Sequence, residues 1–291
     1  MKPAPFIYHD PRSLHEAAGM LASLENARVL AGGQSLMPMM NFRYVMPDHL
    51  IDLNKVGELA YLRCDGAALH IGAMTRQREL EFSAEIGARC PLLHEALAHV
   101  GHRQTRNRGT IGGSLCHLDP SAELVNVTAL LGGTVHAAST RGTRDIAFTE
   151  FAAAYMTTSL EPDELLAGVT LPLPDRRDGY AFVEFARRHG DFAIVACSAL
   201  LGLDRNGDIK EAALAISGLG HAPVRPAAIE RALIGQKPAG AAFKAAAAEA
   251  AKFEATADAY VTSVYRQHLA RVLTFRALEQ AARRAAEQAH G

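Results

Sequence analysis

The stretch Ala31-Gly32-Gly33-Gln34-Ser35-Leu36 decides the fold that we expect, because it follows directly on the apolar run at residues 28–31. An apolar run that ends in two glycines predicts a strand whose backbone approaches a ligand closely, since glycine lacks Cβ and tolerates positive φ. Successive N–H groups in such a turn form an anion-binding nest, and Ser35 adds a hydroxyl donor. The stretch therefore predicts a phosphate site at the end of a strand.

A second glycine pair occurs in Thr110-Ile111-Gly112-Gly113-Ser114, with a hydroxyl side chain at each end. Taken alone, either pair is more often a tight turn without a ligand, because glycine marks turns by default. Two nests together suit a ligand that carries two adjacent phosphates. The chain has no G-x-G-x-x-G after a strand, which argues against a Rossmann site, and no G-x-x-x-x-G-K-[ST], which excludes a P-loop.

The local pattern predicts an α+β protein whose architecture changes near Leu171-Pro172-Leu173-Pro174-Asp175, where two prolines disfavour both helix and central strand. We therefore expect two domains, residues 1–175 and 176–291. Capping, proline and periodicity signals predict these elements in the first domain: a helix at 13–24 with Ser13 as N-cap and Glu16 as its capping-box partner, strands at 28–31, 50–53 and 68–72, and helices at 92–100 and from an Asp119 N-cap to Leu131.

The second domain has a different pattern. Apolar runs at 180–188, 193–203 and 209–217 predict three strands, and Asn206-Gly207 between the last two is a strong hairpin signal. The alanine-rich segment 241–289 predicts two or three helices that pack on this antiparallel sheet.

Composition narrows the functional classes. A net charge of −1 gives no electrostatic footprint for nucleic acid. We expect no membrane span, because no run approaches about 20 apolar residues, and no signal peptide. The cysteines have no zinc or iron–sulfur spacing and the histidines near residue 99 lack further ligands, so we expect no metal site and a cytoplasmic location. The four cysteines are Cys64, Cys90, Cys116 and Cys197.

Three segments resemble motifs of the FAD-binding medium subunit of the molybdenum hydroxylases, a family that includes subunits of carbon monoxide, xanthine, nicotine and caffeine dehydrogenases. The segments are Ala31 to Pro38 with Asn41-Phe42-Arg43, Arg106 to Ser114 with Asp119-Pro120 and Glu123, and Arg187 to Ala193. The resemblance covers almost the whole chain. It implies a PCMH/vanillyl-alcohol-oxidase-type FAD-binding domain of two subdomains, followed by a C-terminal antiparallel sheet with helices.

The resemblance also implies which residues contact FAD. The backbone of residues 32–36 and 110–114 would hold the diphosphate, and Glu123 would bond ribityl or adenosine hydroxyls. Leu165 or Leu166 would pack on the cofactor, and Arg188 or Phe192 would lie near the isoalloxazine. The expected cofactor-binding residues are Ala31, Gly32, Gly33, Gln34, Ser35, Leu36, Thr110, Gly112, Gly113, Ser114, Glu123, Leu166, Arg188 and Phe192.

The function implied is electron transfer, with no catalytic residue for substrate in this chain. A molybdenum cofactor in a large partner subunit would hydroxylate the substrate, and two [2Fe–2S] clusters in a small partner would relay electrons to FAD, which would pass them to an external acceptor. Because its four cysteines are isolated in the sequence, the chain resembles the members of this family whose medium subunit holds flavin and no iron–sulfur cluster. Two alternatives stay open: a self-contained FAD oxidase of the same superfamily, and a non-catalytic assembly subunit.

Overall fold

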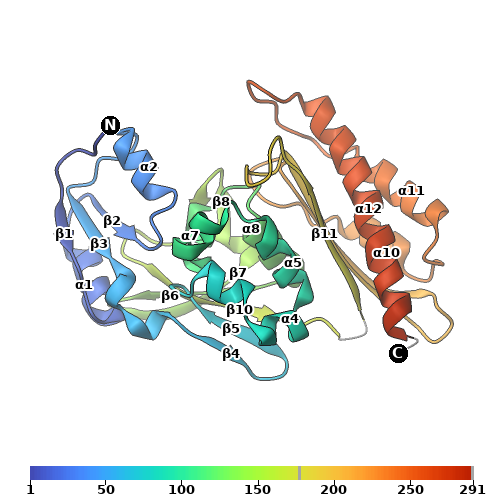
Figure 1. Cartoon of the computed structure of the whole chain (residues 1–291), viewed down its shortest axis with the longest axis horizontal. Helices are drawn as coiled ribbons and strands as arrows, with labels where there is room; N and C mark the ends of the chain where they lie inside the picture. The colour runs from blue at the N-terminus through green and yellow to red at the C-terminus, as the bar shows by residue number, and fades with distance from the viewer. Residues whose placement is uncertain (176–177, 290–291) are drawn as a thin grey trace.

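The computed structural model describes residues 1–175 and 178–289, and Figure 1 shows a small sheet at one end and a long helix, α12, at the other. The first subdomain is a parallel sheet in the order β1-β3-β2, from Ile7–His9, His49–Asp52 and Ala27–Leu30. The helices α1 (Leu14–Ser23) and α2 (Leu36–Asn41) belong to it. The helix expected at 13–24 and the strands expected at 28–31 and 50–53 are confirmed, each within one residue at either end.

The start of α1 shows why the sequence predicts it. Ser13 Oγ accepts from the N–H of Glu16 at 3.1 Å, as an N-cap should. The Glu16 carboxylate accepts from the N–H of Arg12 at 2.7 Å. The reciprocal bond of the expected capping box is therefore made one residue earlier than Ser13.

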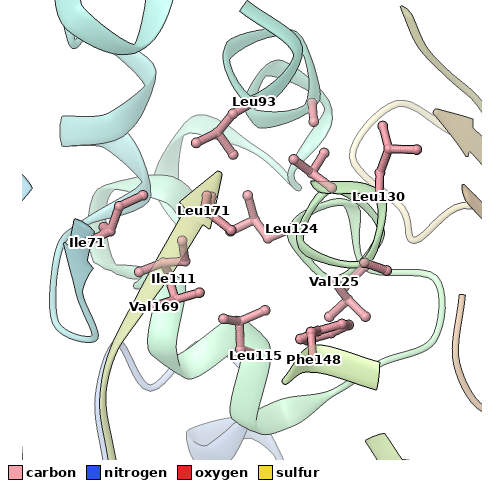
Figure 2. Close-up of a cluster of buried hydrophobic side chains, with 14 of the residues drawn as sticks. Ile71, Leu93, Ile111, Leu115, Leu124, Val125, Leu130, Phe148, Val169 and Leu171 are labelled. Carbon is pink, nitrogen blue, oxygen red and sulfur yellow. The ribbon is translucent and has the colours of Figure 1, made fainter. Parts of the chain in front are cut away.

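The second subdomain is an antiparallel sheet in the order β4-β5-β10-β6-β7. Its strands are Leu62–Cys64, Ala68–Gly72, Leu165–Pro172, Thr134–Ser139 and Gly142–Ala147. Helices α5 (Pro91–His99), α7 (Ile111–His117) and α8 (Glu123–Leu131) contribute to the core on one side of it. Figure 2 shows Ile71, Val169 and Leu171 of the sheet gathered with helical side chains such as Leu115 and Leu124.

Shorter elements connect these layers. They are η1 (Leu53–Lys55), η2 (Gly57–Leu59), α3 (Gln77–Glu81), α4 (Ala84–Arg89), α6 (Arg103–Arg108), α9 (Phe148–Phe151), β8 (Ala152–Ala154) and β9 (Thr157–Thr158). The helix expected from an Asp119 N-cap begins later, at Glu123, so that N-cap prediction is wrong. Asp119 Oδ1 accepts from the N–H of Ser121 at 2.8 Å, and the aspartate therefore forms a local turn ahead of the helix.

The C-terminal domain is the antiparallel sheet β11-β12-β13, from Gly179–Phe185, Val195–Leu203 and Ile209–Ser217, with the predicted hairpin at Asn206-Gly207. It also holds α10 (Ala227–Leu233), α11 (Gly240–Ala250) and α12 (Ser263–Ala289). Helix α12 packs on β11 and β12, whereas α8 of the first domain packs on β12 and β13 (Figure 1). The expected boundary at 175/176 adjoins Arg176 and Arg177, which lie outside the described residues, as do His290 and Gly291.

None of the helices in the described ranges has the length and apolar character needed to cross a membrane.

Candidate functional site

The first glycine pair forms the expected turn between β2 and α2. Gly33 has φ +73°, a conformation that favours glycine. The first bond back from α2 runs from the N–H of Met37 to Gly33 O at 3.1 Å. Within the described residues, the N–H groups of residues 33–36 have no acceptor, and the Ser35 hydroxyl makes no capping bond. These donors are available to an anionic ligand.

The second glycine pair differs from the first, because its N–H groups already have partners. The N–H of Gly112 donates to Ala73 O at 2.9 Å, and that of Gly113 donates to Thr110 Oγ1 at 3.0 Å. The N–H groups of Ile111 and Ser114 bond Thr75 O and Thr110 O. The expectation of a second nest of free N–H groups is therefore wrong.

Close packing explains the second glycine pair. A Cβ on Gly112 would lie 2.6 Å from the Cβ of Ala73, so only glycine lets α7 approach this backbone. A Cβ on Gly113 would lie 2.9 Å from Thr110 Oγ1, the atom that caps α7. What this motif leaves for a ligand is the half-buried Ser114 hydroxyl, which has no hydrogen bond to the described part of the chain.

The fold brings the two glycine motifs into contact. A Cβ on Gly32 would lie 2.3 Å from Arg108 O and 2.8 Å from the Cα of Gly109. A Cβ on Gly113 would lie 3.5 Å from that of Ala31. The turn after β2 and the segment that enters α7 therefore form one continuous backbone surface, as the pairing of the motifs predicted.

Glu123 is the first residue of α8 and is only 3% exposed. Burial, followed by the nearby Glu184 carboxylate, raises its pKa to about 8. Glu184 on β11 lies 3.2 Å from His99 Nδ1 at the end of α5, and this contact raises the pKa of His99. Three titratable side chains from α5, α8 and β11 thus meet where the two domains pack.

Arg188 and Phe192 lie in the loop between β11 and β12, and both are exposed, Phe192 by 52%. The loop packs against the first domain at Gly190, which has φ +86°. A Cβ on Gly190 would lie 2.3 Å from the His102 ring. Within the described residues, neither Arg188 nor Phe192 bonds a glycine motif. Leu166 is buried in the core of the first domain, so its side chain contributes packing.

Residues 4–174 match the family model for the FAD binding domain in molybdopterin dehydrogenase, and residues 180–281 match the CO dehydrogenase flavoprotein C-terminal domain. The chain belongs to this flavoprotein family. It is 37% identical to the caffeine dehydrogenase subunit beta of Pseudomonas sp. (strain CBB1) over 98% of this chain and 97% of that protein.

Two solved structures agree with this membership. A carbon monoxide dehydrogenase from Hydrogenophaga pseudoflava that lacks the Mo-pyranopterin moiety superposes with a TM-score of 0.94 at 33% identity, covering 98% of this chain and 99% of that one. Quinoline 2-oxidoreductase from Pseudomonas putida 86 gives 0.94 at 35% identity with the same coverage. The predicted fold class is confirmed, and the chain is an oxidoreductase subunit that binds FAD.

The residues of this flavoprotein suit an FAD diphosphate. The unpartnered N–H groups of residues 33–36 are donors for a diphosphate, and the hydroxyls of Ser35 and Ser114 add to them. Gly32 has no room for a side chain because Arg108 O lies there, so glycine at this position lets the two motifs approach each other.

The sequence-based prediction missed four residues, two beside Glu123 at the domain contact and two beside the glycine motifs. Glu184 carried a weak signal, because it is a charged residue within an apolar strand, and His99 lies at the end of a predicted helix. Asn54 and Arg76 carried none, because they bond main-chain carbonyls that no side-chain pattern reveals.

Proposed function

We propose that this flavoprotein takes electrons from [2Fe–2S] clusters of a small partner subunit and passes them to an external acceptor. A large partner subunit would hold the molybdenum cofactor and hydroxylate the substrate. FAD, when bound, supplies the redox chemistry of this chain. The observation that carries the proposal is the free N–H row of residues 33–36 in contact with the second glycine motif.

The residues of this chain would bind and orient the cofactor and act on no substrate. The backbone of the first motif would hold the diphosphate, and Ser114 and Thr110 would flank it. Glu123, whose pKa is raised by burial, would bond a ribityl or adenosine hydroxyl. The full proposed set is Ala31, Gly32, Gly33, Gln34, Ser35, Leu36, Thr110, Gly112, Gly113, Ser114, Glu123, Leu166, Arg188 and Phe192.

The exposed loop that carries Arg188 and Phe192 would reach toward the isoalloxazine from the second domain. We keep the domain division at 1–175 and 176–291 and a cytoplasmic location as parts of this proposal. The names of the relatives support this class of complex. They leave the substrate open, since they include caffeine dehydrogenase, carbon monoxide dehydrogenase and quinoline 2-oxidoreductase.

The variant Gly32→Ala tests the proposed cofactor site. Its Cβ would collide with Arg108 O, so the backbone must shift. Each hydrogen bond to the cofactor that this shift breaks costs about 1 kcal/mol. We expect the Kd for FAD to rise about tenfold, measured by titrating apoprotein and following flavin absorbance at about 450 nm. Gly19→Ala is the control, because a Cβ there meets no heavy atom within 4 Å.

Two results would contradict the proposal. A purified chain that takes up no FAD on reconstitution has no cofactor site. Reduction of the flavin by an organic substrate added to the isolated chain would instead identify a self-contained oxidase.

A further inference from the structure

Two side chains outside the glycine motifs connect them. Arg76 donates through Nη1 to Arg108 O and through Nη2 to Asn54 Oδ1. Asn54 Nδ2 in turn donates to Ala31 O at 3.1 Å. A continuous row of hydrogen bonds therefore runs from the carbonyl that precedes Gly109 to the carbonyl that precedes Gly32.

The two bonded carbonyls determine where Gly32 lies. In a trans peptide the C=O and the following N–H point in opposite directions. Because Asn54 holds Ala31 O, the N–H of Gly32 points away from Asn54. Arg108 O, held by Arg76, is the atom that a Cβ on Gly32 would meet at 2.3 Å. Asn54 therefore fixes the peptide that precedes Gly32, and Arg76 fixes the carbonyl that Gly32 packs against.

Each of the two side chains is anchored in a different subdomain. Asn54 lies in η1, where its N–H bonds Asp52 Oδ1 at 2.9 Å, and Asp52 Oδ2 accepts from the Tyr8 hydroxyl at 2.6 Å. The backbone of Arg76 forms an isolated antiparallel β-bridge with Thr110 at the entrance to α7. The pair therefore spans the boundary between the three-stranded and five-stranded sheets.

We propose that Asn54 and Arg76 are positioning residues that hold the two glycine motifs in the geometry that binds the diphosphate before the cofactor arrives. The inference rests on the proposed function. The backbone donors that bind an anion must be held in place to act together, and neither side chain needs to touch the ligand. Their loss therefore reduces cofactor affinity more than it reduces stability.

Three variants and a control separate the effects. Asn54→Asp keeps an acceptor for Arg76 but removes the Nδ2 donor to Ala31 O and to Asp52 Oδ1, and it places a second carboxylate beside Asp52. Arg76→Met removes both bonds of the guanidinium. Arg76→Lys is the milder change, because one ammonium replaces a two-pronged donor. Lys55→Met is the control: it neighbours Asn54, but its partner is the exposed Asp10.

Three quantities are measured on the full-length chain: the Kd for FAD, the thermal midpoint of the apoprotein, and amide hydrogen exchange without FAD over residues 111–114, whose N–H groups are all hydrogen-bonded. We expect Asn54→Asp and Arg76→Met to raise the Kd about ten- to a hundredfold, the loss seen when residues that orient the ligands of a metal site are removed. Exchange over residues 111–114 should accelerate, because Arg76 holds the segment that enters α7, while the midpoint stays within a few degrees of wild type. Arg76→Lys should be intermediate and Lys55→Met unchanged.

An unchanged Kd in both folded variants overturns the inference, as does a Kd that rises equally in Lys55→Met. If Asn54→Asp or Arg76→Met does not fold, Arg76→Lys decides by the same criteria. If the wild-type chain binds no FAD, the proposed function fails, and hydrogen exchange alone then judges the positioning role. Faster exchange over residues 111–114 supports it, and unchanged exchange overturns it.

Discussion

At the scale of single residues, Glu123 makes the stability of this protein depend on pH. Its pKa rises from 4.5 to about 8, mainly because it is buried. Between these values the unfolded chain releases the proton and the folded chain keeps it, so stability falls as pH rises through this interval. His99 acts in the same direction, because its pKa is also raised and its contribution is lost at higher pH.

The variant Glu123→Gln isolates the part that belongs to Glu123, since it leaves the His99 contact with Glu184 in place. We expect its thermal midpoint to fall less between about pH 5 and pH 8 than that of wild type. Glu254→Gln, at an exposed position, is the control. Midpoint curves of Glu123→Gln and wild type that run parallel across this range would show that Glu123 is ionised in the folded chain.

The same scale shows how far sequence reasoning reaches at the site. The positive φ of Gly33 was predicted correctly, because a strand end followed by two glycines favours that conformation. Gly112 was assigned to ligand binding, but glycine is equally required where a helix packs on Ala73, and the pattern cannot distinguish the two causes. Asn54 and Arg76 bond carbonyls that are distant in sequence, so they become visible only in the folded chain.

At the scale of elements, the five-stranded sheet carries a polar row across its strands. The Thr170 hydroxyl on β10 lies 3.0 Å from His70 Nδ1 and 2.7 Å from His136 Nε2. The other ring nitrogens face Asp65 at 2.9 Å and Asp145 at 2.7 Å. A hydroxyl can donate one hydrogen bond and accept another, so Thr170 connects both histidines across three neighbouring strands.

Thr170→Val removes this connection and keeps the shape of the side chain. We expect a loss of about 1–2 kcal/mol in the free energy of unfolding, since two hydrogen bonds of about 1 kcal/mol disappear. Urea unfolding measures it. Thr134→Val is the matched control, because Thr134 lies opposite Thr170 on β6 and its hydroxyl has no bond to the described residues. Equal losses in the two variants would show that the row of side chains adds no stability.

Element boundaries also show what the sequence could and could not supply. The strand at 209–217 was predicted to the residue, because an Asn-Gly turn fixes where it begins. The strand expected at 180–188 ends at Phe185, since the loop that follows turns at Gly190 to meet His102. That contact comes from the other domain, and no local pattern reports it.

At the scale of the whole molecule, a buried amide on α8 joins the two domains. Asn126 Nδ2 donates to Ser217 Oγ at 2.7 Å and to Ala215 O at 3.2 Å, and Asn126 Oδ1 accepts from Ser198 Oγ. Asn126 is fully buried, so no solvent water can take over its hydrogen bonds to Ser198, Ala215 and Ser217 if the amide is removed. The position of the loop with Arg188 and Phe192 therefore depends on this docking, because β12 follows directly after that loop.

Asn126→Leu has nearly the same shape and removes all three bonds, leaving the partners on β12 and β13 unsatisfied. We expect a loss of about 2–4 kcal/mol in the free energy of unfolding, with faster hydrogen exchange on both faces of the domain contact. Thr128→Val is the matched control, because its hydroxyl is equally buried on α8 but bonds Leu124 O within the same helix. If Asn126→Leu costs no more than Thr128→Val, apolar packing alone holds the domains together. FAD affinity would then be insensitive to both changes, whereas a docking role predicts weaker FAD binding in Asn126→Leu only.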